Sequence, residues 1–231
     1  INLPSTRWTM GDRVFYNCSS LKSISFPEML WGIGWQMCTN CTSLESISIP
    51  STYYSIGWQS FKNCTSLKTL ELPEGVMSIG WQTFANCTNL ETVILPSSIY
   101  SIGDNAFSGC PKLKTLGEKG GSYNIQFQFT EIPDNGFGNM TSLTQIHIPD
   151  FVTYIGRSAF INCTNLKSIR MADGVEKIAS NAFNGCTKLT EVFLADTITS
   201  VESNAFRNCI NLQMVQFPEN LYLIESNAFQ N

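Results

Sequence analysis

Charged residues are scarce in this chain of 231 residues, where Asp, Glu, Lys and Arg together make up 14% of the composition. The 14 Lys and Arg are outnumbered by 18 Asp and Glu, which gives a formal net charge of -4. Because there is no cationic surplus to displace counterions, binding of nucleic acid is not expected. No apolar run approaches the roughly 18 residues of a membrane-spanning helix, so no membrane span is expected either.

Histidine is nearly absent, since His147 is the only one in the chain. A single imidazole, no glycine-rich phosphate loop and no set of spaced metal ligands leave no convergent cluster for acid-base, nucleophilic or metal chemistry. We therefore expect a protein that is not an enzyme and that binds no metal or other cofactor.

The nine cysteines do not suit a disulfide framework, because their number is odd. They stand at positions 18, 38, 41, 64, 87, 110, 163, 186 and 209, and all but Cys38 follow a spacing of 23 within two series. Only Cys38 and Cys41 are close in sequence, and nothing elsewhere completes a metal site with them. We interpret the periodic cysteines as small, buried apolar side chains.

A repeat of 23 residues runs through the sequence. Phe61, Phe84 and Phe107 are 23 residues apart, and a step of 30 leads from Phe107 to Phe137. Phe15 and Cys38 complete the first series, and the second consists of Phe137, Phe160, Phe183, Phe206 and Phe229. A single unit of this length cannot bury its own apolar face, so the units must stack in register, with residues 23 apart becoming neighbours.

Each repeat shows the same order of structural signals. The segments LKSISF, LESISI, LKTLEL and LETVIL alternate apolar and polar residues, which predicts a half-buried strand that the following proline ends. A second apolar pair, such as Val76 and Ile79, predicts another short extended piece. Residues suited to a helix N-cap stand three positions before the Phe, at Asp104, Asp134, Ser180, Ser203 and Ser226. They predict a short helical turn that carries the Phe, and the Asn or Gly two residues after it indicates a left-handed C-cap.

The predicted fold is an α/β solenoid: about ten coils, a parallel β-sheet on the concave face, and short helical turns or strands on the convex side. The pattern LxxIxI followed by P, then IGxxAFxxCxxL, resembles the leucine-rich repeats of the BspA-like or Treponema pallidum-type class. The resemblance covers almost the whole chain outside residues 117–128. It implies a secreted or surface-exposed recognition protein without a cofactor, of a class associated with adhesion and contact with host proteins. The implied location is extracellular, at the cell surface or periplasmic.

The longer step in the repeat divides the chain into three parts. We expect leucine-rich repeats in residues 1–116, an insertion in residues 117–131 and further repeats in residues 132–231, in one continuous solenoid with or without a bend. Within the insertion, Ile125, Phe127 and Phe129 alternate with polar residues after a Gly-rich stretch, which predicts an extra strand pair or edge flap. A crevice beneath it, lined by Tyr123, Ile125 and Phe127, is a candidate binding pocket.

Every Trp falls in one of two columns that mostly hold polar residues in the other repeats. Seven residues before the Phe position stand Trp8, Trp31, Tyr54, Met77 and Tyr100, and three before it stand Trp35, Trp58 and Trp81. Two adjacent aromatic stripes are therefore expected on the side away from the main sheet. Such exposed aromatic surface is typical of an interface with a protein, a sugar or a second copy of the chain. The alternative is that the rings stack on one another and only shield the coils.

The main sheet carries a second candidate binding patch in its C-terminal half. One outward column reads His147, Arg170, Phe193 and Gln216, with Glu191 beside it. Mixed chemistry on a rigid platform suits recognition, although an ordinary solvated sheet would have a similar pattern.

Together these patterns predict non-enzymatic recognition of a macromolecule, in which a preorganised array loses little entropy on binding. The expected partner is a host or extracellular protein, with a carbohydrate or a second copy of the chain as further possibilities. The alternative is a structural module that self-assembles through its aromatic stripes and uncapped ends.

Overall fold

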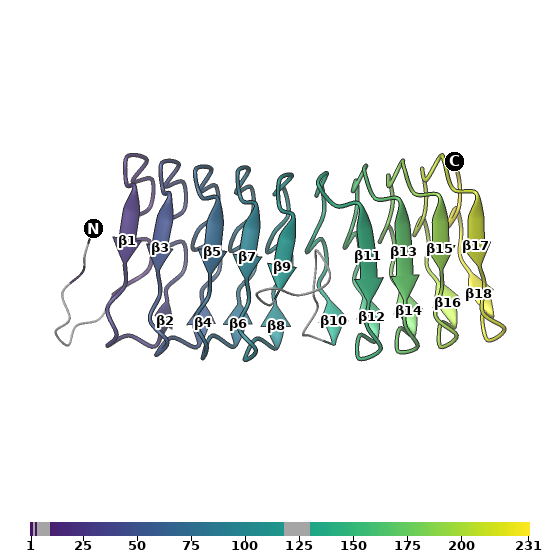
Figure 1. Cartoon of the computed structure of the whole chain (residues 1–231), viewed down its shortest axis with the longest axis horizontal. Coiled ribbons are helices and arrows are strands. Elements are labelled where there is room, and N and C mark those ends of the chain that lie inside the picture. The colour runs from purple at the N-terminus through teal and green to yellow at the C-terminus, as the bar shows by residue number, and fades with distance from the viewer. Residues whose placement is uncertain (2, 4–9, 118–129) are drawn as a thin grey trace.

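The computed structural model describes residues 1, 3, 10–117 and 130–231, in which the chain winds as a β-solenoid. Each coil contributes two short strands, and every strand pair is parallel. In Figure 1 the coils lie side by side along one long axis, with the N-terminal and C-terminal coils at opposite ends. The predicted stacking of repeats is therefore confirmed.

The strands fall into two rows. The first row, which we call the long-strand face, contains β1 (Ser23–Ser25), β3 (Ser46–Ser48), β5 (Thr69–Glu71), β7 (Thr92–Ile94), β9 (Thr115–Gly117), β11 (Gln145–Ile148), β13 (Ser168–Met171), β15 (Glu191–Phe193) and β17 (Met214–Gln216). The second row, which we call the short-strand face, contains β2 (Gly32–Ile33), β4 (Ser55–Ile56), β6 (Ser78–Ile79), β8 (Ser101–Ile102), β10 (Glu131–Ile132), β12 (Tyr154–Ile155), β14 (Lys177–Ile178), β16 (Ser200–Val201) and β18 (Leu223–Ile224).

Strand pairing follows the period of 23 residues. Ile24 is paired with Ile47, and Leu70 is paired with Val93, so equivalent residues of adjacent repeats lie next to each other. Among the described residues, the first row forms the sheets β1-β3, β5-β7-β9 and β11-β13-β15-β17, and the second forms β2-β4-β6-β8 and β10-β12-β14-β16-β18. Both rows are thus interrupted at the insertion.

The core consists of the aligned apolar columns. The rings of Phe61 and Phe84 stack with their centroids 5.6 Å apart, and those of Phe84 and Phe107 with theirs 5.5 Å apart. All three rings are fully buried. Stacked rings at one-coil spacing bury large apolar surfaces against each other, which stabilises the array along its axis.

The expected helical turns are not found in the part of the chain that the structure describes. The segment around Phe61 is a series of turns, because Gln59 and Asn63 have left-handed backbones with φ values of 55° and 61°. Two left-handed residues four positions apart cannot belong to one right-handed helix. The predicted left-handed position after the Phe is thus confirmed, but it caps no helix, and the α/β label is not confirmed.

These turns are hydrogen-bonded between coils. The backbone N–H groups of Gln59, Phe61 and Asn63 donate to the carbonyl groups of Trp81, Thr83 and Ala85 at 2.9, 3.0 and 2.9 Å. Alternate N–H groups of the turn therefore point along the solenoid axis, as they do in a strand. This satisfies backbone groups that a helix would have bonded internally.

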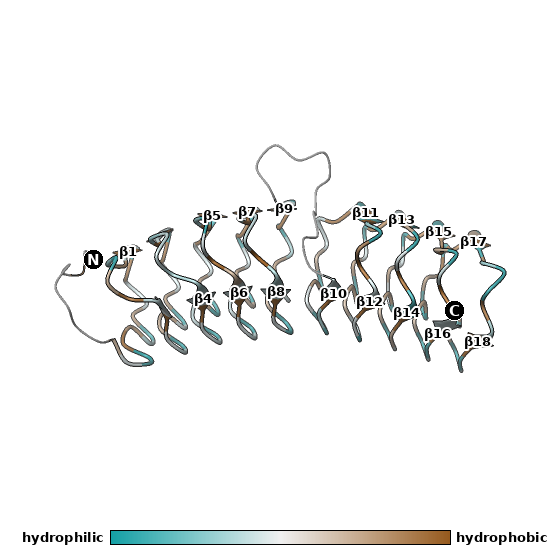
Figure 2. Ribbon diagram, turned by 90° about the horizontal axis from the view of Figure 1, so that it is seen from below, coloured by the Kyte–Doolittle hydropathy of each residue, from teal (hydrophilic) through white to brown (hydrophobic). Residues whose placement is uncertain are grey.

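The expected count of ten coils is also not confirmed. The described residues contain nine pairs of strands. The ten positions of the Phe column lie in the turns before, between and after these pairs, so they exceed the strand pairs by one. Figure 2 shows that the array curves only gently. For this reason we name the two faces by their strands rather than as concave and convex.

The cysteine column is buried as predicted, with one exception. Cys41 and the six later members of the column are fully buried, whereas Cys18, in the first described coil, is exposed. Each of these seven buried thiols also donates to a carbonyl group one coil away, as Cys110 does to Phe84 at 3.2 Å. The cysteines are therefore weak hydrogen-bond donors as well as small apolar side chains.

Candidate functional site

Two aromatic stripes lie on either side of the sheet β2-β4-β6-β8 on the short-strand face, and we call them together the aromatic face. One stripe consists of Trp31, Tyr54, Met77 and Tyr100, each directly before a strand, and the other of Trp35, Trp58 and Trp81. The exposed fractions are 71%, 47% and 66% for Trp31, Tyr54 and Tyr100, and 55%, 53% and 41% for Trp35, Trp58 and Trp81. Both stripes are therefore open to solvent.

One pair of rings in each stripe also packs together. Trp35 and Trp58 are stacked, with their centroids 5.0 Å apart and their planes 5° apart. Trp31 and Tyr54 are tilted by 47° at 6.4 Å. Self-packing and exposure, which the sequence offered as alternatives, thus occur together. The stack covers one face of each of these two rings, and about half of each side chain remains exposed.

Glycine makes room for the tryptophan stripe. A Cβ atom at Gly57 would lie 2.5 Å from the carbonyl oxygen of Ile33, and one at Gly80 would lie 2.7 Å from Cδ1 of Trp58. Both distances are too short for a side chain, so the glycines allow adjacent coils and the indole ring to approach closely.

A groove of about 630 Å³ runs along this sheet. Its lining includes the three Trp side chains of the second stripe and the hydroxyl-bearing residues Ser55, Ser78 and Ser101. The only charged residue among the described residues that line it is Asp104. The groove therefore offers aromatic and hydroxyl groups at one-coil spacing and almost no charge.

The expected N-cap residues bond to the next coil. Asp134 Oδ1 accepts a hydrogen bond from Arg157 N at 2.5 Å, and Asp12, which stands in the same column but was not among the predicted caps, accepts one through Oδ1 from the backbone N–H of Trp35 at 2.8 Å. Asp104 Oδ1 accepts one from Asp134 N at 3.1 Å. The prediction of helix caps is therefore wrong, because these carboxylates satisfy a donor 23 or 30 residues later rather than one in their own turn.

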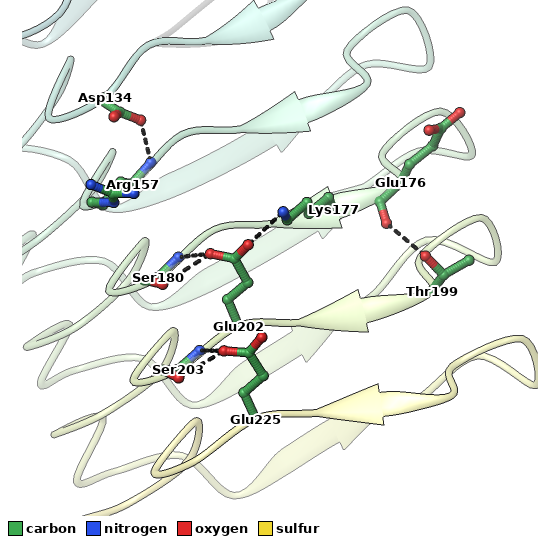
Figure 3. Close-up of polar contacts among 9 residues, drawn as sticks. All are labelled: Asp134, Arg157, Glu176, Lys177, Ser180, Thr199, Glu202, Ser203 and Glu225. Carbon is green, nitrogen blue, oxygen red and sulfur yellow. Dashed lines mark hydrogen bonds and ion pairs between the residues drawn. The ribbon is translucent and has the colours of Figure 1, made fainter.

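The tryptophan column becomes polar in the C-terminal half (Figure 3). Glu202 accepts hydrogen bonds from the backbone N–H and the hydroxyl of Ser180 at 2.8 and 2.9 Å, and its other oxygen lies 2.5 Å from Nζ of Lys177. Partial burial alone would raise the pKa of Glu202, but the hydrogen bonds from Lys177 and Ser180 outweigh it and lower this pKa. The same hydrogen bond raises the pKa of Lys177.

The structure places the second candidate patch on β11, β13, β15 and β17. His147 is paired with Arg170, Arg170 with Phe193, and Phe193 with Gln216, so the four side chains form one column across adjacent strands. Arg170 and Gln216 are exposed, whereas His147 and Phe193 are half-buried. Glu191, which is exposed, is paired with Met214. The column is thus assembled on one face, and its role in binding stays a prediction.

Four predicted site residues lie outside the described residues. They are Trp8 of the first aromatic stripe and Tyr123, Ile125 and Phe127 of the insertion. The division of the chain at residues 117–131 likewise stays a prediction. The turns on either side are nevertheless joined, since Asn105 N donates to Asp134 O at 2.9 Å and Phe107 N to Gly136 O at 3.2 Å.

Sequence reasoning missed a polar ladder beside the tryptophans. Gln36 Nε2 donates to Gln59 Oε1, and Gln59 Nε2 donates to Gln82 Oε1 at 2.8 Å. Lys62 Nζ donates to the same oxygen of Gln82 at 2.7 Å. The recurrence of Gln two residues before the Phe position was the available signal. This ladder holds together the turns that carry the Trp side chains.

The described residues contain no group of three or more His, Cys, Asp or Glu side chains that could hold a metal ion. Within the same ranges, the chain forms no helix of the length and apolarity needed to cross a membrane.

A family model for the "BspA type Leucine rich repeat region (6 copies)" matches residues 1–114 and 121–231. The chain belongs to this family. The resemblance found in the repeat pattern is therefore confirmed, and with it the leucine-rich-repeat solenoid. Repeats of this family generally mediate protein-protein recognition. A comparison with curated proteins finds no match.

Solved structures of bacterial leucine-rich repeat proteins have a similar fold. The Treponema pallidum leucine-rich repeat protein TpLRR is 22% identical with a TM-score of 0.51, over 92% of this chain and 77% of that one. The pneumococcal vaccine antigen PcpA is 19% identical with a TM-score of 0.51, over 89% of this chain and 47% of that one. A leucine rich cell surface protein from Faecalibacterium prausnitzii A2-165 is 23% identical with a TM-score of 0.46, over 97% and 86%.

Proposed function

We propose that this BspA-type leucine-rich repeat chain is a non-enzymatic recognition module that binds a protein partner through its aromatic face. The observation that carries the proposal is the row of Trp35, Trp58 and Trp81 on adjacent coils, each between 41% and 55% exposed. Exposed Trp and Tyr clusters are typical anchors of protein interfaces. Trp35 and Trp58 are held by their mutual stacking, and the Gln ladder joins the turns that carry all three Trp side chains, so less side-chain entropy is lost on binding.

A protein partner suits this face better than a carbohydrate. Sugars stack on open aromatic faces, and the stack of Trp35 on Trp58 at 5.0 Å leaves fewer such faces available because it covers one face of each ring. The groove lining has almost no charge, which favours an apolar or hydroxyl-rich protein surface over an anionic polymer. Neighbouring polar residues such as Lys62 and Asp104 would form the rim of the interface.

The test replaces Trp35, Trp58 and Trp81 together by Ser, the residue that stands in the same column at positions 180, 203 and 226. Wild-type protein is immobilised and exposed to serum and extracellular-matrix proteins, and each retained protein is then purified and titrated by calorimetry. We expect at least one purified protein to bind the wild type and to lose roughly 100-fold or more in affinity for the triple variant, as expected for several lost anchors.

The matched control changes exposed apolar residues away from the aromatic face. A variant with Ile210 and Tyr222 replaced by Ser removes side chains of comparable exposure in the C-terminal coils. It should bind as the wild type does. Equal affinities of wild type, triple variant and control for every purified binder would refute the aromatic face as the binding surface. The column of His147, Arg170, Phe193 and Gln216 would then be the favoured candidate.

A second candidate function is self-assembly through the aromatic face, because exposed aromatic surface of this kind can also pack against a second copy of the chain. Trp31 and Tyr100 of the first stripe are 71% and 66% exposed. Light scattering coupled to size exclusion tests this: a defined oligomer that dissociates when Trp31 and Tyr100 are replaced by Ser supports assembly, and a monomer at all concentrations excludes it.

We also propose that the protein acts outside the cytoplasm, at a cell surface, in the periplasm or in the extracellular medium. The proposal rests on the BspA-type repeat pattern, which implies a secreted or surface-exposed protein. Fractionation of the source cells followed by immunodetection tests it, and recovery of the protein only from the cytosolic fraction would exclude it.

A further inference from the structure

Cys38 stands where the repeat otherwise places a core phenylalanine, and the core is rearranged around it. The column reads Phe15, Cys38 and Phe61 over the first three coils. Because Cys38 is smaller than Phe, a neighbouring ring fills the space: Phe26 lies edge-on to Phe61 with centroids 6.4 Å apart. Cys38 itself is fully buried. A thiol rather than a ring is therefore built into a packed site at this position.

This substitution brings two thiols into one turn. Cys41 N donates to Cys38 O at 3.1 Å, so residues 38–41 form a hydrogen-bonded four-residue turn. Such a turn brings its first and last Cα atoms within about 7 Å, which overlaps the range of about 4.4–6.8 Å that disulfides require. Each of the other buried cysteines has Phe three residues before it, so no second pair within one turn arises among them.

The thiols of Cys38 and Cys41 influence each other's pKa. The neighbouring Cys41 thiol, together with burial, raises the pKa of Cys38, and the neighbouring Cys38 thiol lowers the pKa of Cys41. Cys41 is thus the side chain that becomes a thiolate more readily, while Cys38 keeps its proton. A thiolate beside a protonated thiol is the arrangement from which dithiol oxidation proceeds in CxxC motifs.

We propose that Cys38 and Cys41 are a redox-active dithiol that closes to an intramolecular disulfide inside the second coil. The oxidant is a low-molecular-weight disulfide such as oxidised glutathione. The thiolate of Cys41 attacks one sulfur of the oxidant, which forms a mixed disulfide and releases one small thiolate. Cys38 then gives its proton to solvent and attacks Sγ of Cys41, which releases the second small thiolate. Two protein thiols and one small disulfide are thereby converted into one protein disulfide and two small thiols.

The oxidised form differs from the reduced form in how it holds the first described coil. In the dithiol, Cys41 donates its thiol hydrogen to Phe15 O at 3.1 Å. A disulfide has no hydrogen to donate, so this bond between the first and second coils is lost. The oxidant reaches Cys41 when the first coil opens, and that coil is the most exposed part of the described N-terminal half. Oxidation should therefore increase hydrogen exchange in residues 11–22.

The test uses the full chain with Cys18→Ser, which removes the exposed thiol that would otherwise form a mixed disulfide. The protein is incubated with oxidised glutathione, denatured, and its free thiols are alkylated. Trypsin then releases residues 23–62 as one peptide, because the sequence has Lys22 and Lys62 at its boundaries and no Lys or Arg between them. This peptide contains only Cys38 and Cys41. We expect it to be unalkylated and two hydrogens lighter than the reduced peptide, and to shift to the doubly alkylated mass after reduction.

Cys41→Ala on the same background is the variant in which the disulfide cannot form, and Cys64→Ala is the matched control for loss of one buried thiol. The control should still yield the lighter peptide. The wild-type chain, which retains Cys18, should give the same product. A doubly alkylated peptide after oxidation, or a disulfide that joins residues 14–22 to residues 23–62 in the wild type, would overturn the proposal.

Discussion

The ring of Phe107 lies parallel to that of Phe137, with their centroids 6.3 Å apart and their planes 6° apart, although the insertion separates the two residues in sequence. Adjacent rings elsewhere in the column are 5.1–5.6 Å apart. The column therefore crosses the insertion with only a small increase in spacing. The inter-coil hydrogen bonds of the turns also continue there, whereas the strand rows do not.

Replacing Phe84 by Ala should strongly destabilise the array. Phe84 is fully buried and stacks on Phe61 and Phe107, so the change removes contacts with both adjacent coils and leaves a cavity. We expect the free energy of unfolding in urea to fall by about 3–5 kcal/mol. Phe151→Ala, at an exposed position, is the control and should change it by no more than about 0.5 kcal/mol. Similar losses in both variants would contradict a continuous ring column.

Substitutions of Asn63 test the left-handed backbone conformation of the turn. Its φ is 61°, and its amide donates to Asn40 Oδ1 at 2.6 Å and accepts from Asn86 Nδ2 at 3.1 Å. Asn63→Ala loses both side-chain bonds and places a residue that disfavours positive φ, so we expect a loss of about 2 kcal/mol. Asn63→Gly loses the same bonds but tolerates the backbone, and should cost about 1 kcal/mol. Chemical denaturation measures both, and equal losses would argue against the left-handed conformation.

The sequence predicted those features that depend on periodicity alone. Once Phe61, Phe84 and Phe107 were seen to be 23 apart, the strand register, the buried columns and the exposure of Trp35 and Trp58 followed from stacking. These features need only the identity of a side chain and its column. They do not require knowledge of the path of the backbone between columns.

The expectation of helical turns failed for a reason that can be located. Asp104 and Asp134 are good N-cap residues in a local reading, but each accepts a hydrogen bond from the following coil. A second left-handed position lies two residues before the Phe, as at Asn105, where φ is 58°. In the N-terminal half the same position holds Gln36, Gln59 and Gln82, which seldom adopt positive φ, so the pattern was hidden. Hydrogen bonding between coils outweighs this local preference.

Stability should fall in alkaline solution because of the buried thiols. Burial raises the pKa of Cys110, Cys163 and Cys209 to about 12, whereas a thiol in the unfolded chain has a pKa of about 8.5. Between these values the unfolded state loses protons that the folded state keeps, so the stabilisation is complete below pH 8 and is lost as pH rises toward 12. We expect about 2 kcal/mol less stability per such thiol at pH 10 than at pH 7.

Urea unfolding of wild type, Cys110→Ser and Cys18→Ser at the two pH values checks this. Cys110→Ser removes one buried thiol and should reduce the difference between pH 7 and pH 10 by about 2 kcal/mol. Cys18→Ser removes an exposed thiol and is the control, for which the difference should equal that of the wild type. A pH-independent stability in all three proteins would contradict burial of neutral thiols.

The hydrogen bonds around Glu202 should make the folding stability fall as the solution becomes acidic. Because hydrogen bonds from Lys177 and Ser180 lower the pKa of Glu202 despite partial burial, the folded state prefers the carboxylate. Its contribution is present above the ordinary carboxyl pKa of about 4.3 and is lost as pH falls through the lower folded-state value. Glu202→Gln should therefore cost about 1 kcal/mol at pH 7, a modest value because Lys177 is half exposed to solvent, and almost nothing near pH 2.

Glu225→Gln is the matched control for this prediction. Glu225 accepts the same two hydrogen bonds from Ser203, at 2.9 and 2.7 Å from its backbone N–H and hydroxyl, but no lysine ion pair is recorded for it in the described part of the chain. The difference between the two variants at pH 7 thus isolates the contribution of Lys177, and it should shrink when salt is raised to about 1 M, where screening acts over about 3 Å. If both variants lose the same stability at every pH and salt concentration, the lysine contributes nothing and only the hydrogen bonds to serine stabilise this end of the column.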